Sequence, residues 1–112
     1  MRTVLPIALA ALLTALPARA AELVLVDSPG CYACLQWKAE VGRYYAKTAE
    51  ARRAPLRRVR ASNLRRAYPG IAGVRATPTF ILVEDGREIG RFIGYAGQKP
   101  FWRALTRLLE RR

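Results

Sequence analysis

The chain has 112 residues, which is enough for one domain but not for two. Its 20 basic and 8 acidic side chains give a formal net charge of +12, and it contains two cysteines and no histidine. We therefore expect one domain in these residues, and two cysteines are too few for a fold that depends on several disulfides.

Residues 1–20 have the three parts of a secretory signal peptide. Arg2 provides the positive start, an apolar stretch follows, and Ala18-Arg19-Ala20 is a small-x-small cleavage signal. Cleavage after Ala20 leaves 92 residues, 21–112, as the mature domain. The alternative is an uncleaved membrane anchor, but the uncharged stretch 3–18 has only 16 residues, and a spanning helix needs roughly 20 apolar residues. We therefore expect export without lasting membrane insertion.

The positive charge has two interpretations. Without the two basic residues of the leader, 18 basic and 8 acidic residues remain, a net charge of +10, and 17 of the 20 basic residues in the whole chain are arginine. One interpretation is an anionic partner, such as a membrane surface, an acidic protein or a nucleic acid. The other is a solvated surface in an arginine-biased chain. We expect no nucleic-acid partner, because an exported protein rarely meets nucleic acid.

The first predicted elements of the mature chain are a strand and a long helix. The run ELVLVD at 22–27 is short and rich in valine and leucine, which predicts a buried strand. The turn Ser28-Pro29-Gly30 separates it from a helix over 31–51, in which Gly42 marks a weak point or a bend. One side of that helix is expected to face the core: Leu35, Val41, Tyr44, Tyr45 and Thr48. The opposite side is expected to face water: Lys38, Glu40, Arg43 and Lys47.

The second half of the chain predicts three strands, a short helix and a terminal helix. In order these are a strand over 56–61, one or two helical turns over 63–68, a strand over 79–83, an Asp-Gly hairpin at 84–87, a strand over 88–95 and an amphipathic helix over 98–111. The terminal helix carries an apolar stripe: Phe101, Trp102, Leu105, Leu108 and Leu109. This order of elements predicts an α/β fold, with a mixed four-stranded sheet flanked by helices.

Cys31 and Cys34 come directly after the first strand, at the start of the predicted helix. Free N–H groups and the dipole at a helix start favour negative charge, and lowering a thiol pKa from about 8.5 to about 7 needs only about 2 kcal/mol. We therefore expect Cys31 to be the attacking sulfur. Cys34 lies one helical turn later, close enough to attack a mixed disulfide and release the partner. No cofactor is expected beyond the redox-active Cys31–Cys34 disulfide itself.

Three alternatives to redox chemistry use the same two cysteines. A zinc site needs four ligands, and without histidine it would require carboxylates or a second protomer. A structural disulfide across so short a loop contributes on the order of 2 kcal/mol in the loop-entropy model, which makes stapling a weak explanation. A pair of buried cysteines acting as small hydrophobic residues is the third alternative. The position of the CxxC pair between a strand and a helix favours the redox interpretation.

A second candidate element is the segment 76–80, in which Pro78 directly precedes a predicted strand. Proline is tolerated at the first position of a strand. Because only about 5–6% of X–Pro peptide bonds are cis, the residues alone favour an ordinary trans bond before Pro78. The loop 94–97 either rims a site near Pro78 or simply leads into the last helix. Trp37 and Trp102 are interpreted as packing residues rather than substrate contacts.

These features resemble the thioredoxin superfamily. The resemblance rests on CYAC after a strand, Thr77-Pro78 before a strand, the Asp-Gly hairpin and the terminal helix. More narrowly, the stretches PGCYAC, RRAPLRRV, TPTFILVEDGREIGRFIGYAG and PFWRAL are similar to SoxS-type periplasmic thioredoxins of sulfur-oxidation systems. The resemblance covers nearly all of residues 22–109.

The resemblance implies a thiol–disulfide oxidoreductase of the periplasm, and we expect the protein to be a monomer. It would take electrons from a membrane thiol transporter and reduce or reactivate a partner protein thiol, such as that of the pathway's sulfur-carrier protein. By position, Cys31 carries over as the nucleophile and Cys34 as the resolving cysteine. Thr77-Pro78 carries over as a substrate-binding turn with a cis peptide bond, whose neighbouring backbone binds substrate as an added strand. Tyr32 and Ala33, between the cysteines, are expected to bind substrate as well.

The chain also departs from ordinary thioredoxins. Tyr32-Ala33 stands between the cysteines in place of Gly-Pro, and Leu25 occupies the place of the buried acid six positions before the first cysteine. Asp27, four positions before Cys31, either substitutes as a proton acceptor or only caps the strand end. These departures favour a reductase dedicated to one partner. The alternatives are a periplasmic disulfide oxidase or isomerase and, from another class, a basic binding module with a structural disulfide.

Overall fold

The structure is a computed structural model that describes residues 3–4 and 21–112. The predicted signal peptide and its cleavage site therefore lie outside the described residues, except for residues 3 and 4. Within the described part of the chain, none of the helices is both long and apolar enough to cross a membrane.

Four strands form one sheet in the order β2-β1-β3-β4. Their bounds are β1 Glu22–Asp27, β2 Leu56–Arg60, β3 Thr79–Glu84 and β4 Arg87–Ile93. β1 pairs with β2 in parallel and with β3 antiparallel, and β3 pairs antiparallel with β4. The predicted mixed four-stranded sheet is confirmed.

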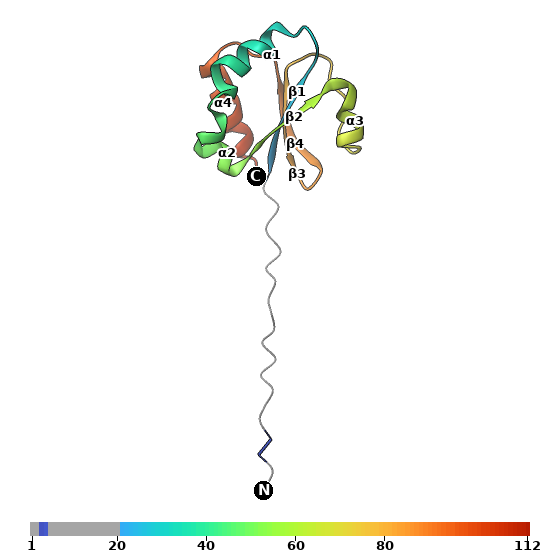
Figure 1. The fold of residues 1–112 in the computed structure, drawn as a ribbon, viewed down its shortest axis with the longest axis vertical. Helices are drawn as coiled ribbons and strands as arrows, with labels where there is room; N and C mark the ends of the chain where they lie inside the picture. Colours follow the sequence, from blue (N-terminus) through green and yellow to red (C-terminus); the bar gives the residue numbers. More distant parts are fainter. Residues whose placement is uncertain (1–2, 5–20) are drawn as a thin grey trace.

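Helices cover both faces of this sheet. They are α1 Tyr32–Trp37, α2 Ala49–Arg53, α3 Leu64–Ala67 and α4 Gln98–Leu109. Figure 1 shows α1, α2 and α4 on one side of the sheet and α3 on the other. β1 is therefore buried on both faces: Leu23 and Leu25 belong to the core under α1 and α4, and Val24 and Val26 to the core under α3. Because both faces of β1 are buried, its sequence is a nearly continuous run of apolar residues instead of an alternating pattern.

The single helix predicted over 31–51 is wrong. After α1 the chain forms a π-helical turn at Lys38–Gly42 (η1) and a 3₁₀ turn at Tyr45–Lys47 (η2) before α2 begins. A π turn holds more residues than an α turn, so it rotates the side chains that follow relative to an unbroken helix. Leu35 and Trp37 lie in α1, before this turn, and the expected stripe is wrong there for another reason: Leu35 is 62% exposed and Trp37 is fully buried. Trp37 is one helical turn before the buried Val41 and shares its face, whereas Leu35, six residues before Val41, does not.

Gly42 ends η1 at the bend that the sequence indicated. A Cβ on Gly42 would lie 2.9 Å from Cζ3 of Trp37 and 3.5 Å from Nη2 of Arg58. Glycine therefore lets the chain pass close to the buried indole ring. Val41 and Tyr45 are buried as predicted. The other two residues of the expected stripe are only half-buried: Tyr44 and Thr48.

An aromatic cluster fills the core between the sheet and the larger helical layer. The ring centroid of Trp37 lies 5.3 Å from that of Phe80 and 5.6 Å from that of Phe101. Trp102 is half-buried and stacks on Tyr45, with ring centroids 6.1 Å apart. Both tryptophans pack against this core, as predicted, and so does the apolar stripe of α4.

The remaining elements lie close to their predicted positions. β2, β4 and α4 each end one or two residues earlier than predicted, and the short helix starts as a 3₁₀ turn, Ala61–Asn63 (η3), ahead of α3. β4 stops just before Gly94, whose φ of +88° favours glycine. In the hairpin, Asp85 and Gly86 have φ values of 52° and 74°, as a type I′ turn requires.

Candidate active site

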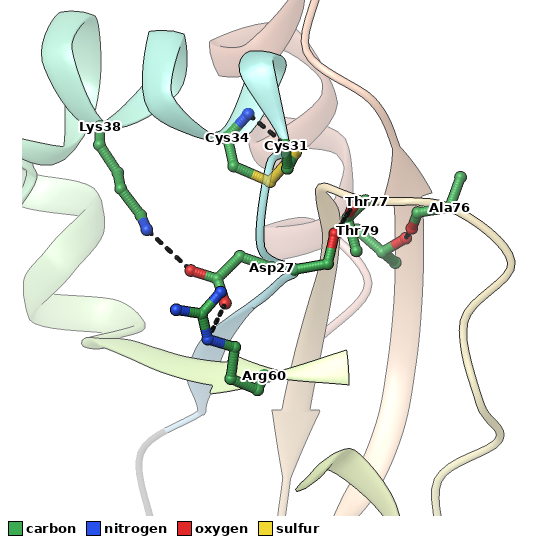
Figure 2. Close-up of a disulfide and its surroundings, with 9 residues drawn as sticks. Asp27, Cys31, Cys34, Lys38, Arg60, Ala76, Thr77 and Thr79 are labelled. Atoms are coloured by element: carbon green, nitrogen blue, oxygen red, sulfur yellow. Dashed lines mark hydrogen bonds and ion pairs between the residues drawn. A yellow bond between two sulfur atoms is a disulfide. The ribbon is translucent and has the colours of Figure 1, made fainter. Parts of the chain in front are cut away.

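The two cysteines of the CxxC segment form a disulfide. Cys31 is the N-cap of α1, and Cys34 lies in the first turn of that helix. The backbone N–H of Cys34 donates a hydrogen bond to Sγ of Cys31 at 3.1 Å (Figure 2). Such a hydrogen bond favours the charged form of the sulfur that receives it. The arrangement therefore agrees with the prediction that Cys31, and not Cys34, carries the attacking thiolate after reduction, and this role stays a prediction.

The two cysteines differ in exposure. Cys34 is 2% exposed, whereas Cys31 is half-buried and the neighbouring Tyr32 is 79% exposed. Ala33 is half-buried between them. A protein that approaches the start of α1 meets Cys31 and Tyr32 first, and Cys34 lies beneath them.

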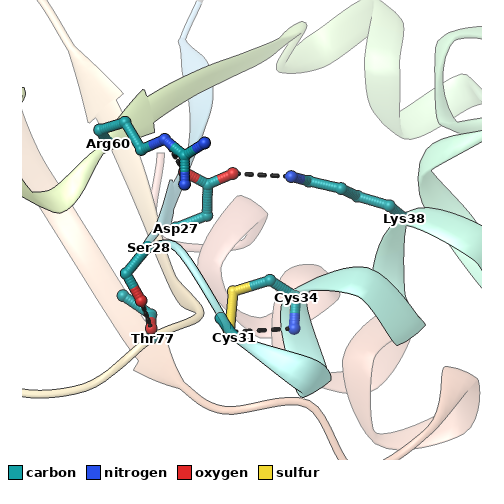
Figure 3. A network of polar contacts seen from close by, with 7 residues as sticks. All are labelled: Asp27, Ser28, Cys31, Cys34, Lys38, Arg60 and Thr77. Carbon is teal, nitrogen blue, oxygen red and sulfur yellow. Dashed lines mark hydrogen bonds and ion pairs between the residues drawn. A yellow bond between two sulfur atoms is a disulfide. The ribbon is translucent and has the colours of Figure 1, made fainter.

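The Thr77-Pro78 turn lies near the disulfide although it is distant in the sequence, and Figures 2 and 3 both show Thr77 next to Cys31. Its peptide bond is cis, the geometry that the family resemblance implied. Oγ of Ser28 and Oγ1 of Thr77 lie 2.5 Å apart in a hydrogen bond, which joins the turn before Cys31 to the turn before β3 (Figure 3). This hydrogen bond brings the two predicted parts of the site, the segment 31–34 and the turn Thr77-Pro78, to the same end of the sheet. Their roles in binding and catalysis stay predictions.

Asp27 is a buried carboxylate held between two cations at the end of β1. Its side chain is 8% exposed, and Nζ of Lys38 donates to its Oδ2 at 2.7 Å. Nε of Arg60 lies 3.8 Å from its Oδ1. Figure 3 shows Lys38 and Arg60 reaching Asp27 from opposite sides. The expectation that Lys38 faces water is corrected, because this ion pair draws it against the strand end. A role for Asp27 as a proton acceptor stays a prediction.

Leu25, which occupies the place of the usual buried acid, is fully buried. Side chains alternate along a strand, so Leu25 and Asp27 point to the same face of the sheet. The acidic group of this chain is thus displaced by two residues along that face, toward the turn that carries Cys31.

Two hydrogen bonds hold the loop 94–97 in place next to the site. On one side the N–H of Gly94 donates to the carbonyl of Pro78 at 2.7 Å. On the other side the hydroxyl of Tyr95 donates to Oε1 of Glu40 at 2.8 Å, so Glu40 is half-buried rather than facing water. Burial and this hydrogen bond raise the pKa of Tyr95. The loop therefore borders the cis-proline turn, and a cavity of about 300 Å³ lies between the loop and α4.

Three polar residues at the site have no role in the sequence-based prediction. The sequence places Ser28 only in a turn and Lys38 only on a solvated face, and Arg60 falls in a strand of mixed polarity. The closeness of Ser28 to Cys31 in sequence is a signal that could have found it. Lys38 and Arg60 meet Asp27 only because η1 and β2 flank the end of β1, and no local sequence pattern carries that information.

The sequence matches the family described as a thioredoxin-like domain over residues 10–109. The chain belongs to the thioredoxin superfamily. Among solved structures, the reduced form of the periplasmic thioredoxin SoxS from Paracoccus pantotrophus is 33% identical to it. That match covers 81% of this chain and 97% of the SoxS chain, with a TM-score of 0.72. The predicted resemblance to SoxS-type thioredoxins is confirmed at the level of sequence and fold.

More distant thioredoxins share the fold alone. The thioredoxin of Fasciola hepatica is 23% identical with a TM-score of 0.57, covering 80% of this chain and 81% of its own. That of Malassezia sympodialis is 18% identical with a TM-score of 0.58, covering 82% of this chain and 77% of its own. No curated protein sequence gives a significant match. This thioredoxin-like chain therefore combines a CxxC disulfide and an adjacent cis-proline turn on the superfamily's fold.

Proposed function

We propose that the protein is a monomeric thiol–disulfide oxidoreductase that reduces a disulfide or a blocked thiol on a partner protein. The observation that carries the proposal is the asymmetry of the Cys31–Cys34 pair. Cys31 is accessible and accepts a hydrogen bond from the backbone N–H of Cys34, whereas Cys34 is buried. An attacking thiolate must be reachable and stabilised, and a resolving thiol needs only to reach the first sulfur.

The proposed reaction has two exchanges. The Cys31 thiolate attacks one sulfur of the partner disulfide, so that a Cys31–partner disulfide forms and the partner's other sulfur leaves as a thiolate. Cys34 then loses its proton and attacks Sγ of Cys31, which closes the Cys31–Cys34 disulfide and releases the partner's second thiolate. The partner gains two electrons and the protein loses two. The state that the structure shows, with the disulfide closed, is the product of this cycle.

We further propose that the reaction takes place in the periplasm. Two observations support this location: the signal-peptide pattern at residues 1–20 and the 33% identity to a thioredoxin described as periplasmic. A membrane thiol transporter would then return the protein to its dithiol form. A sulfur-carrier protein is the partner that the SoxS resemblance suggests.

A trapping experiment tests the proposed function and identifies the partner. The Cys34→Ser variant keeps the attacking sulfur but loses the resolving one, so the Cys31–partner disulfide should accumulate in the periplasm of the expressing cell. On a non-reducing gel it should appear as a band of higher mass that dithiothreitol removes. The matched Cys31→Ser variant, which keeps only the buried sulfur, should give no such band. If Cys34→Ser gives no adduct where the equivalent variant of a known thioredoxin gives one, the proposal fails.

A further inference from the structure

Three cations, two of them exposed, lie around the end of β1 and on the edge strand β2. Lys38, at the start of η1, and Arg60, at the end of β2, both reach Asp27. Arg58 shares the face of Arg60, because side chains alternate along β2. Leu56, on that same face, packs against the core under α1, whereas Val59 faces the core under α3. We call Lys38, Arg58 and Arg60 the basic strip.

The basic strip carries more positive charge than its neighbours neutralise. Asp27 is the carboxylate that contacts two of the three cations. Among the described residues, Arg58 forms no ion pair, and its guanidinium lies near Gly42 at the end of η1. Arg58 is exposed, and the Arg60 side chain is 50% exposed. Three cations against one carboxylate leave a surplus of two positive charges along the last part of β2, beside the end of β1.

The strip follows an open edge of the sheet. β2 is the outer strand and pairs only with β1 within the described sheet, so its other edge can hydrogen-bond to an extended chain. Beside this edge lies a cavity of about 380 Å³ that includes Arg58 and is otherwise lined mainly by apolar groups: Gly42, Tyr45, Ala46, Ala51, Pro55 and Leu56. An extended segment along β2 would thus meet backbone donors and acceptors, cations, and an apolar recess.

We propose that the basic strip docks an acidic, extended segment of the partner protein, and that this contact directs the partner's disulfide to Cys31. This inference rests on the proposed function. Charge complementarity selects the occupant, since a surplus of cations favours carboxylates and raises the rate of encounter with them. An extended peptide also fits the strand edge, which a flat membrane surface does not. The other explanation is that the arginines only prevent edge-to-edge association of the sheet.

Two synthetic peptide disulfides separate these explanations. Both carry the same cysteine disulfide, flanked in one by aspartate and glutamate and in the other by serine and glutamine. The reduced full-length mature protein should reduce the acidic peptide about 10-fold faster than the neutral one at low ionic strength. This rate ratio should fall toward one as salt is added, because salt screens exposed charges.

Matched charge reversals locate the effect. Arg58→Glu should bring the rate ratio to about one, whereas Arg103→Glu, an equal charge change at an exposed position on α4, should keep the wild-type ratio. A ratio near one in the wild-type protein, or an equal loss in both variants, would overturn the docking site. The docking site would also be overturned if the wild-type protein shows no preference for the acidic peptide but binds phosphatidylglycerol vesicles, and Arg58→Glu abolishes that binding. The cations would then bind a membrane surface. Failure to reduce either peptide would instead contradict the proposed function.

Discussion

At the scale of single residues, the hydrogen bond between Ser28 and Thr77 connects the two turns that form the candidate site. The two hydroxyl oxygens are 2.5 Å apart, and Thr77 is half-buried. A contact of this kind contributes about 1 kcal/mol to stability. Because it joins the cysteine turn to the proline turn, it also fixes the position of each turn relative to the other.

A double-mutant cycle of Ser28→Ala and Thr77→Val measures this contact. Each single change should lower the free energy of unfolding of the oxidised protein by about 1 kcal/mol, and the double variant should lose less than the sum. Urea unfolding gives the three values. Ser62→Ala, at an exposed position in η3, is the control and should have little effect. Additive losses at the first two positions would show that the hydroxyls do not interact.

Tyr68 is a second residue whose hydroxyl joins separate elements. It donates to Oε2 of Glu22 at 2.6 Å and accepts from Nη1 of Arg57 at 3.1 Å. Burial and the carboxylate of Glu22 raise the pKa of Tyr68 to about 12. The folded protein therefore binds this proton more tightly than the unfolded chain does. The resulting stabilisation is fully present below about pH 10 and is lost as the pH rises through about 12.

We expect Tyr68→Phe to be less stable than the wild type by about 2 kcal/mol near pH 8, because two hydrogen bonds to charged groups are lost. The difference should shrink between about pH 10 and pH 12, where the wild type loses its own Tyr68 proton. Urea unfolding across this range measures it. Tyr32→Phe removes the hydroxyl of a tyrosine that is 79% exposed and should show neither effect. A difference in the free energy of unfolding between the wild type and Tyr68→Phe that stays constant with pH would contradict the raised pKa of Tyr68.

At the scale of elements, the π turn η1 decides how the segment after the cysteines packs. Trp37, the last residue of α1, is fully buried directly before this turn, and Gly42, the last residue of the turn, lies against its indole ring. The buried residues Cys34, Trp37, Val41 and Tyr45 follow one another at helical spacings of three or four residues. This spacing predicts a helix, but it does not reveal the π turn within it. The strand β1 was predictable because it is a short, continuous run of apolar residues. The helix α4 was predictable because its apolar residues form a single stripe at helical spacing.

Gly42→Ala tests the close approach at the end of η1. Alanine ordinarily stabilises helical positions relative to glycine. Here its Cβ would lie 2.9 Å from an atom of the fully buried Trp37, so we expect a net loss of about 1–3 kcal/mol in the free energy of unfolding. Gly73→Ala adds a Cβ with nothing within 4 Å and should change stability little. A Gly42→Ala variant as stable as the wild type would mean that Trp37 is free to move.

At the scale of the whole molecule, the site depends on the order of the strands. β1 ends at the cysteine turn, and its neighbours β2 and β3 bring Arg60 and the Thr77-Pro78 turn to the same end of the sheet. The individual motifs were predictable because each has a local pattern. The hydrogen bond to Ser28 and the ion pairs of Asp27 were not, because they arise only when separate strands are assembled.

The central claim is that Cys31 and Cys34 form a reversible dithiol–disulfide couple that donates electrons. The most direct test is the reduction potential, obtained by equilibrating the purified protein with defined ratios of reduced and oxidised dithiothreitol or glutathione and quantifying free thiols. A reductase should have a potential near that of thioredoxin, about −270 mV. A potential near −120 mV, typical of a strong oxidant, or a disulfide that does not exchange at all, would contradict the account.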